Sequence, residues 1–183
     1  MTAEALNTAQ AVSPTARPSL STLSWVTTAQ TLHLLQRELS PHGHFDVAVV
    51  VTGVNDLIDQ VPSHRAVASR EALANWLRNA GGVHHVVFAP LPPVHHFPGL
   101  PQPLRWVAGS DARRHNQALA RWAATRQDVS VVDMKMPLNR GVMADDGFHP
   151  GEPVYRYCAG AISGHVAARV WPEIQNTPQE TTT

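Results

Sequence analysis

Cysteine and lysine are almost missing from this sequence, since each occurs once among 183 residues. A lone cysteine, Cys158, cannot form an internal disulfide and cannot by itself make a structural zinc site. An excess of charge of either sign is also missing, because fourteen Lys and Arg residues balance fourteen Asp and Glu residues. The chain therefore has no strong positive field to attract nucleic acid or an acidic membrane surface, and we expect no nucleic-acid partner.

Long hydrophobic runs are absent as well. No stretch approaches the roughly 20 apolar residues of a membrane span. The first 25 residues contain neither the basic start nor the apolar centre of a secretion signal. We therefore expect a cytoplasmic protein with no membrane span. The hydrophobic content of 43% suits one domain with a substantial core.

The two ends of the chain differ in composition from the middle. Residues 1–24 are rich in Ala, Thr, Ser and Pro and show no persistent apolar spacing, which predicts a flexible arm. Residues 172–183 are rich in Thr, Pro and Gln, which predicts a disordered tail. The packed domain is therefore expected to span residues 25–171.

Helical and strand patterns alternate within this domain. Three apolar runs have the character of strands buried on both faces, as in a parallel sheet: residues 45–51, 86–89 and 129–133. Four segments have helical spacing: residues 27–39, 63–80, 104–126 and 152–170. The segment 90–103 is too rich in proline for helix or sheet and predicts a long loop. The alternation indicates an α/β fold with helices on both faces of a parallel sheet.

Capping residues mark the ends of two of these helices. Thr27 or Thr28 is placed to cap the first helix, Ser63 to cap the second, and the glycine pair 81–82 to end it. The second helix is expected to turn one apolar side toward the core: Val67, Leu73, Leu77 and Ala80. Tryptophans on predicted helices are expected to pack in the core: Trp76, Trp106, Trp122 and Trp171.

Two polar clusters lie in loops that follow predicted strands. In parallel sheets ligands bind beyond the carboxyl ends of the strands, so loops beginning at Gly53, Pro90 and Met134 should share one edge. The first cluster is Gly53-Val-Asn55-Asp56. Glycine permits a sharp turn there, and the neutral Asn55 amide can direct an N–H at developing negative charge. The simpler alternative is an Asx turn that closes the strand.

The second cluster, Asp146-Gly-Phe-His149-Pro150, precedes the last helix. A spacing of three residues lets the Asp146 carboxylate orient one imidazole nitrogen of His149, while the other nitrogen acts as a general base. The alternative is that Asp146 forms a turn with the following glycine, Pro150 opens a helix, and His149 is an ordinary loop residue.

Together, the two clusters resemble the third and fifth conserved blocks of the SGNH, or GDSL-type, serine hydrolases. The resemblance covers residues 24–168. It implies a three-layer α/β/α sandwich with a parallel sheet and hydrolysis of small-molecule carboxylic esters through an acyl-serine. It also implies that His149 is the base, Asp146 its orienting partner and Asn55 a donor of the oxyanion hole.

The family's nucleophile block, Gly-Asp-Ser after a first strand, has no counterpart before Trp25. The nucleophile is therefore unassigned, and Trp25 stands where the family has a second oxyanion-hole glycine. Without a first strand, the run at 45–51 would keep one unpaired edge. The arm could supply a strand from residues 20–26, or a second copy of the chain could cover the edge in a homo-oligomer. We favour a third explanation, a truncated or rearranged reading frame.

Eleven histidines invite comparison with metal sites. His84 and His85 are adjacent at the start of a strand, so they should point to opposite faces. His42 and His44 lack further ligands that can be placed with them, and the pair at 95–96 lies in the proline-rich loop. We therefore expect neither a metal nor another cofactor.

Three functions remain as hypotheses. The first is a serine esterase of the SGNH type, and the second is a catalytically inactive relative or binding module that keeps the crevice alone. The third is a histidine-based metal binder. Replacement of His149 separates them, because it should abolish turnover only in the esterase.

Overall fold

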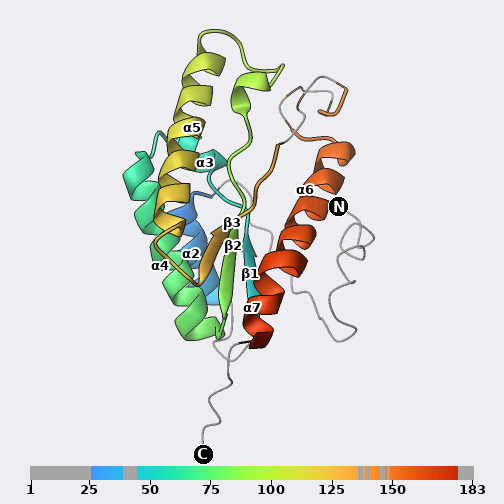
Figure 1. Cartoon of the computed structure of the whole chain (residues 1–183). Helices are drawn as coiled ribbons and strands as arrows, with labels where there is room; N and C mark the ends of the chain where they lie inside the picture. The colour runs from blue at the N-terminus through green and yellow to red at the C-terminus, as the bar shows by residue number, and fades with distance from the viewer. Residues whose placement is uncertain are drawn as a thin grey trace, which may run out of the picture.

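The structure is a computed structural model that describes residues 26–38, 45–135, 138, 141–144, 147 and 149–176 (Figure 1). The elements follow in chain order: α2 (Thr28–Glu38), β1 (Val47–Val50), α3 (Val54–Ile58), α4 (Ser63–Gly81), β2 (His85–Phe88), the 3₁₀ turn η2 (Val94–His96), α5 (Leu104–Ala123), β3 (Val129–Val131), α6 (Glu152–His165), the π-helical turn η3 (Val166–Val170) and α7 (Trp171–Asn176). The described strands and helices therefore alternate as the sequence predicts.

The three strands form a parallel sheet in the order β1-β2-β3. Val47 is in register with His85, and Val86 with Val129. In the described part of the chain β1 pairs with β2 alone, and the Val49 side chain at this edge is 44% exposed. The prediction of a strand buried on both faces therefore fails at Val49, although Val50 belongs to the core on one face and Val47 packs against the core on the other. The pattern of a buried strand was right for β2, all four residues of which are buried.

Helices cover both faces of the sheet (Figure 1). On one face, Val86 and Phe88 of β2 share a core with Leu73 of α4 and Leu119 of α5. On the other face, Val87 shares a second core with residues of α6 and η3: Ala161, Ile162, Val166 and Val170. The alternation of Val86, Val87 and Phe88 between the two cores follows from the period of two along a strand. The protein is therefore a three-layer α/β/α sandwich.

The predicted capping residues are confirmed at two helix ends and wrong at a third. Thr27 Oγ1 accepts a hydrogen bond from the Gln30 amide, while Gln30 Oε1 accepts from the Thr27 amide at 2.8 Å, which is a capping box. Gly82 ends α4 in the left-handed conformation with φ of 62°. Ser63, however, is the first residue of α4 and follows Pro62 at the N-cap, so its predicted capping role is wrong. Proline at this position fixes φ for entry into the helix.

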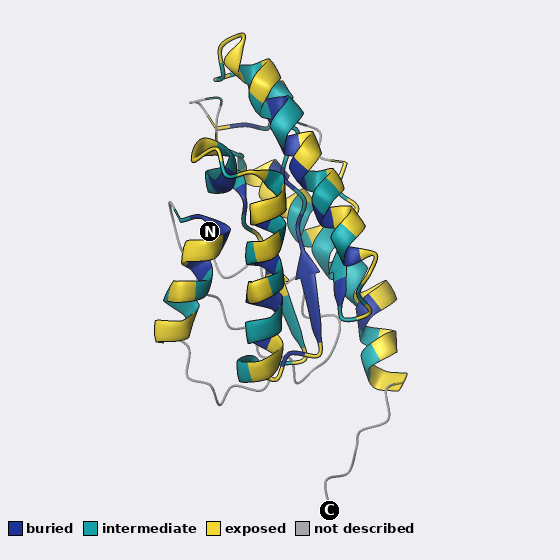
Figure 2. Cartoon of the chain, turned by 90° about the vertical axis from the view of Figure 1, so that its left-hand side faces the viewer, coloured by how far each residue is buried: buried dark blue, intermediate teal, exposed yellow. Residues whose placement is uncertain are grey.

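The buried face of α4 differs from the predicted one. Val67 and Ala80 are only half-buried, whereas Leu73, Leu77 and three further residues are buried: Ala66, Arg70 and Ala74. Figure 2 shows this helix with its exposed turns on the outside. The buried face of α4 therefore includes a charged residue, Arg70, whose burial the spacing of apolar residues does not predict.

Two predictions about aromatic and terminal residues need correction. Trp76 and Trp122 pack against the core, but Trp106 in the first turn of α5 is 65% exposed. The last helical segment continues beyond residue 170 through α7, so residues 172–176 are helical. No helix of the described residues is long and apolar enough to cross a membrane.

A chain of three polar side chains lies between the sheet and α6. Ser130 Oγ of β3 lies 2.9 Å from His85 Nε2 of β2 and 2.8 Å from His165 Nε2 of α6. Burial lowers the pKa of His85, with His165 adding to the shift and Glu173 and Asp128 opposing it. Burial also lowers the pKa of His165, as does the positive charge of Arg169. The folded protein therefore favours neutral imidazoles at both positions.

This chain of side chains predicts a loss of stability in acid. Because both folded pKa values lie below the unfolded value of about 6.5, the unfolded chain binds more protons, and the free energy of unfolding falls as the pH falls below about 6.5. The double variant His85→Gln/His165→Gln keeps side chains that can form hydrogen bonds, but glutamine does not gain a proton between about pH 7.5 and about pH 5. We expect urea unfolding at about pH 7.5 and about pH 5 to show a smaller acid loss for this variant. The exposed control His84→Gln should keep the full loss, and an equal loss in all three proteins would contradict the account.

Candidate active site

The chain turns sharply at the carboxyl end of β1. Gly53 has φ of 116° and forms the N-cap of α3. A Cβ atom at this position would lie 2.4 Å from Arg70 Nη2 and 3.1 Å from a methyl group of Leu91. Both the backbone conformation and the packing therefore require glycine, as the sequence predicts for a turn at the sheet edge.

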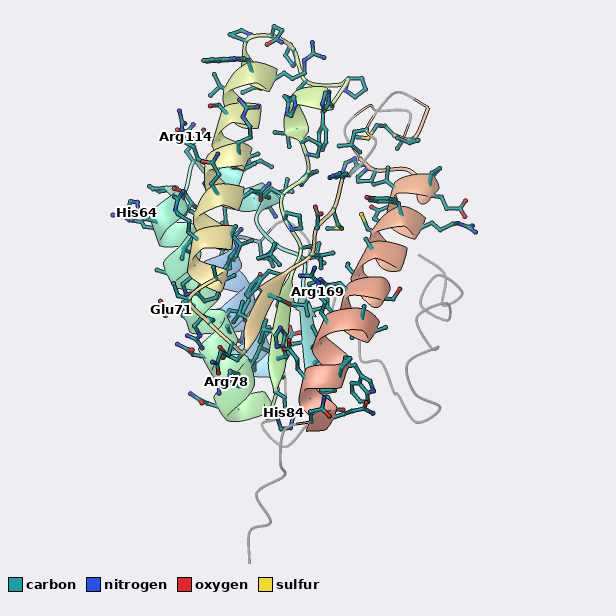
Figure 3. All side chains as sticks on the ribbon, in the orientation of Figure 1. His64, Glu71, Arg78, His84, Arg114 and Arg169 are labelled. Carbon is teal, nitrogen blue, oxygen red and sulfur yellow. The ribbon has the colours of Figure 1, made fainter. Side chains whose placement is uncertain are left out.

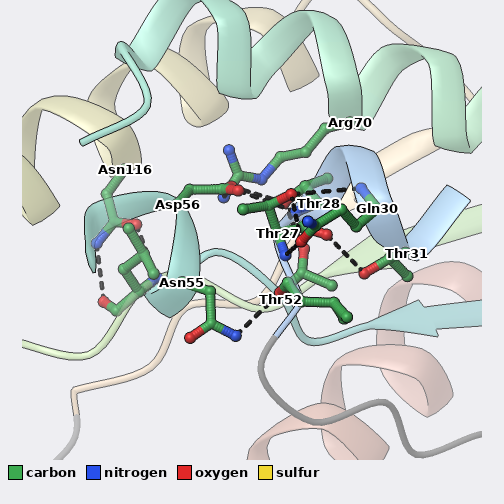
Figure 4. A network of polar contacts seen from close by, with 11 residues as sticks. Thr27, Thr28, Gln30, Thr31, Thr52, Asn55, Asp56, Arg70 and Asn116 are labelled. Carbon is green, nitrogen blue, oxygen red and sulfur yellow. Dashed lines mark hydrogen bonds and ion pairs between the residues drawn. The ribbon is translucent and has the colours of Figure 1, made fainter. Parts of the chain in front are cut away.

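Asp56 is the buried centre of a polar network at this turn (Figure 4). The whole residue is 1% exposed, and its carboxylate accepts hydrogen bonds from the Thr28 amide at 2.9 Å and the Thr28 hydroxyl at 2.7 Å. Arg70 Nη2 lies 3.6 Å from Asp56 Oδ2, and both side chains are 2% exposed. The Thr28 hydroxyl also lies 3.1 Å from the Thr52 hydroxyl. Asp56 thus joins the start of α2, the end of β1 and the middle of α4.

The guanidinium of Arg70 is held in an apolar layer by this carboxylate. Burial lowers the pKa of Arg70, and the charge of Asp56 opposes that shift. Residue 70 was missed by sequence analysis, although it occupies the same helical stripe as Ala66, Leu73 and Leu77. An arginine in the middle of an apolar stripe is the available signal, because such a residue is rarely buried without an acidic partner.

Asn55 points toward the segment that precedes α2. Its Nδ2 group donates a hydrogen bond to the Val26 carbonyl at 3.0 Å. This bond fixes the plane of the amide and places residue 26 beside the turn after β1. Trp25, the predicted substitute for the second oxyanion-hole glycine, lies outside the described residues, but its neighbour Val26 contacts Asn55.

Asn116 fixes the loop after β2 from α5. The Leu91 amide donates to Asn116 Oδ1 at 2.8 Å, and Asn116 Nδ2 donates to the Leu91 carbonyl at 2.9 Å. Because the Asn116 amide both accepts from and donates to the backbone of Leu91, it holds the loop in one position. Asn116 was also missed, because nothing in the local pattern of a helix distinguishes a bridging asparagine from a solvated one.

His149 lies before α6 in a hairpin whose described residues are 141–144, 147 and 149–151, and which we call the His149 hairpin. The Ala144 amide donates to the His149 carbonyl at 2.8 Å, and the Gly151 amide donates to the Val142 carbonyl at 2.9 Å. His149 is exposed. The hairpin is attached to the proline-rich loop by the Gly99 amide, which donates to the Gly147 carbonyl at 2.9 Å. Asp146 lies outside the described residues, so its pairing with His149 stays a prediction.

One apolar cluster joins all three loops at the carboxyl edge of the sheet. Its members come from the turn after β1, from the proline-rich loop with the adjoining part of α5, and from the His149 hairpin with the segment before it: Val54, Leu57, Leu91, Val94, Phe97, Leu100, Ala108, Ala112, Leu138 and Met143. The expectation that these loops share one edge is therefore confirmed. The turn that carries Asn55 and the hairpin that carries His149 are supported by the same packed side chains.

The described residues contain no group of three or more His, Cys, Asp or Glu side chains that could hold a metal ion. His84 is exposed while His85 is buried, in agreement with their expected opposite directions. His42 and His44 lie outside the described residues. Cys158 is half-buried, and burial raises the pKa of its thiol, which disfavours the reactive thiolate.

Known structures share this architecture. A carbohydrate esterase of family 3 from Talaromyces cellulolyticus is 15% identical with a TM-score of 0.67, over 96% of this chain and 90% of that one. An acetylxylan esterase from Geobacillus stearothermophilus is 18% identical with a TM-score of 0.63, over 90% and 79% of the two chains. A GDSL-like lipase from Bacteroides thetaiotaomicron is 18% identical with a TM-score of 0.58, over 78% and 72%. At these identities the likeness shows the fold.

The family of the protein is shown by its sequence. No curated protein matches the chain. The family model for GDSL-like lipases and acylhydrolases, however, matches residues 5–157. This range contains the turn after β1, the proline-rich loop and the His149 hairpin, and it begins ahead of the predicted domain start. The chain therefore belongs to the GDSL-like lipase/acylhydrolase family.

Proposed function

We propose that this protein hydrolyses small carboxylic esters by acyl transfer through a serine. His149 acts as the general base, Asp146 orients its imidazole, and Asn55 donates a hydrogen bond to the oxyanion. The observation that carries the proposal is the apolar cluster that supports the Asn55 turn and the His149 hairpin together. A base and an oxyanion donor must be held at one site for acyl transfer, and membership of the family supports this choice of reaction.

The proposed reaction proceeds in two halves. The serine oxygen attacks the ester carbonyl carbon while His149 takes the hydroxyl proton, and the tetrahedral intermediate expels the alcohol, which receives that proton. Water then attacks the acyl-serine with His149 again as base, and the acid leaves as the serine recovers its proton. The exposed position of His149 gives its ring access to a substrate at the surface.

Asn55 suits the role of an oxyanion donor because its amide is already fixed. One hydrogen of Nδ2 is used on the Val26 carbonyl, and the second hydrogen of the same group is directed by that bond. A preoriented donor stabilises developing charge without reorganisation during the reaction. The adjacent Asp56 keeps the turn rigid through Thr28 and Arg70.

The nucleophile is the unassigned member of the site. None of the ten serines in the sequence follows a Gly-Asp pair. Four of them precede α2 and lie outside the described residues: Ser13, Ser19, Ser21 and Ser24. A fluorophosphonate probe, which forms an adduct with an activated serine, followed by peptide mapping identifies the nucleophile directly.

Replacing His149 tests the base. We expect His149→Ala to lower kcat/KM for p-nitrophenyl acetate by about 10²- to 10⁴-fold, because the serine loses its proton acceptor. Single-turnover assays and the intact mass after fluorophosphonate treatment measure the effect. The matched control is His84→Ala, an exposed histidine directly before β2, which should keep wild-type activity. Equal activity in both variants would contradict the role of His149.

Replacing Asn55 tests the oxyanion donor. We expect Asn55→Ala to lower kcat by about 10²- to 10³-fold with a smaller change in KM, because the donor acts on charge that develops in the transition state. The control Gln30→Ala weakens the capping box beside Val26 and so tests a purely structural effect. If both variants lose kcat equally, Asn55 acts through the fold and the proposed role is wrong.

The second candidate is a noncatalytic member of the family that binds small esters. This alternative is supported by the sequence as given, in which no serine follows a Gly-Asp pair. A folded protein that forms no fluorophosphonate adduct and hydrolyses no ester would support this function. A single adduct that His149→Ala abolishes would support the esterase.

A further inference from the structure

The first turn of α5 displays apolar side chains to solvent. Leu104 is 53% exposed, Trp106 65% and Val107 45%. Pro101 and Pro103 in the preceding loop are also exposed. We call residues 101–107 the α5 tip. Several exposed apolar side chains in one short segment, a tryptophan among them, mark a site of interaction more often than single scattered ones do.

The α5 tip is ordered and convex. The Arg105 amide donates to the Pro101 carbonyl at 2.9 Å, and the Trp106 amide donates to the Pro103 carbonyl at 3.0 Å. Below the tip, Gly109 packs so closely against His95 that a Cβ atom would lie 2.5 Å from the His95 Cβ. Figures 1 and 2 show the start of α5 and its preceding loop as one projecting end of the molecule. The apolar side chains are therefore held outward on a rigid end.

The segment 90–107, which contains the α5 tip and the loop before it, carries one formal charge, the positive charge of Arg105. No Asp or Glu occurs from residue 72 to residue 110. Arg105 lies within the tip, and the exposed Arg113 lies close enough to His95 to lower its pKa, although burial of His95 is the larger cause. Arg114, which Figure 3 shows on the outside of α5, is paired with Asp111. The segment of the tip is therefore locally cationic, although the zero net charge of the whole chain predicts no attraction to an acidic membrane surface.

We propose that the α5 tip docks on an anionic lipid surface. Leu104 and Trp106 enter the boundary between headgroups and acyl chains, and Arg105 and Arg113 contact lipid phosphates. A deformable lipid surface suits a convex apolar end, because a protein partner would need a matching groove. Tryptophan favours this boundary, and nearby arginines add attraction to anionic headgroups.

Docking would place the candidate active site next to the lipid. The loop that leads into the α5 tip is bonded to the His149 hairpin through the Gly99 amide and the Gly147 carbonyl. Binding itself rests only on the tip, so it does not depend on the proposed ester hydrolysis.

Vesicle flotation tests the proposal with the full chain. The vesicles are phosphatidylcholine with about 30% phosphatidylglycerol, compared with phosphatidylcholine alone. We expect binding to the anionic vesicles, a loss of roughly tenfold or more for Leu104→Ser/Trp106→Ser, and a loss of about fivefold for Arg105→Gln. Added salt should weaken binding of the wild type more than that of Arg105→Gln. The control Tyr155→Ser removes a side chain that is 46% exposed on α6 and should bind like the wild type.

Several results would overturn the proposal. One is binding by Leu104→Ser/Trp106→Ser that equals the wild type, and another is no binding of the wild type to anionic vesicles. Tighter binding to single-stranded DNA than to the vesicles would make the tip a nucleic-acid surface. A wild-type dimer that the double variant converts to a monomer, without vesicle binding, would make it a contact between two copies. Thermal unfolding confirms that each variant is folded.

Discussion

The buried ion pair between Asp56 and Arg70 is the constraint on which the carboxyl edge of the sheet depends. Removing two charges from water is costly, and their attraction offsets that cost only when further hydrogen bonds satisfy the groups. Asp56 meets this condition through the amide and hydroxyl of Thr28. Loss of Arg70 would leave a buried carboxylate without its cation, at a cost of about 3 kcal/mol or more. The pair thereby selects one arrangement of α2, α3 and α4 around the end of β1.

The candidate site follows from this arrangement. The position of Gly53 is set by Arg70 beneath it, and Asn55 is set by the following turn and by the Val26 carbonyl. After the neighbouring strand β2, Asn116 of α5 fixes the loop at Leu91, which shares an apolar cluster with Met143 of the His149 hairpin. Each of these contacts fixes one loop relative to the next. A candidate base and a candidate oxyanion donor are thus supported by side chains that do not themselves take part in chemistry.

Local pattern was sufficient for the elements and for the edge that carries the site. Apolar runs predicted all three strands, Thr27 and the glycine pair predicted helix ends, and the parallel sheet then required the loops to meet. The exposure of Val49 does not follow from the apolar run. It agrees instead with the unpaired edge that the family resemblance predicts for this strand, because β1 pairs with β2 alone among the described residues.

Residues whose role lies in distant contacts were also missed. Arg70 and Asn116 act through partners fourteen and twenty-five positions away, at Asp56 and Leu91, so no local pattern reveals them. Trp106 has the helical setting of a core residue, but the first turn of α5 extends past the packed layer. The continuation of the last helix through η3 likewise depends on the burial of Val170 against the sheet, which overrides the composition of the segment that follows.

Amide hydrogen exchange at Thr28 tests the central claim most directly. The Thr28 amide is bonded to a carboxylate that is itself held by Arg70, so it should exchange as slowly as the amides of β2, by global unfolding. In Arg70→Met its protection should fall well below that of β2, while Arg78→Met, which changes an arginine 45% exposed on the same helix, should leave it unchanged. Fast exchange at Thr28 in the wild type, or equal protection in all three proteins, would contradict the account.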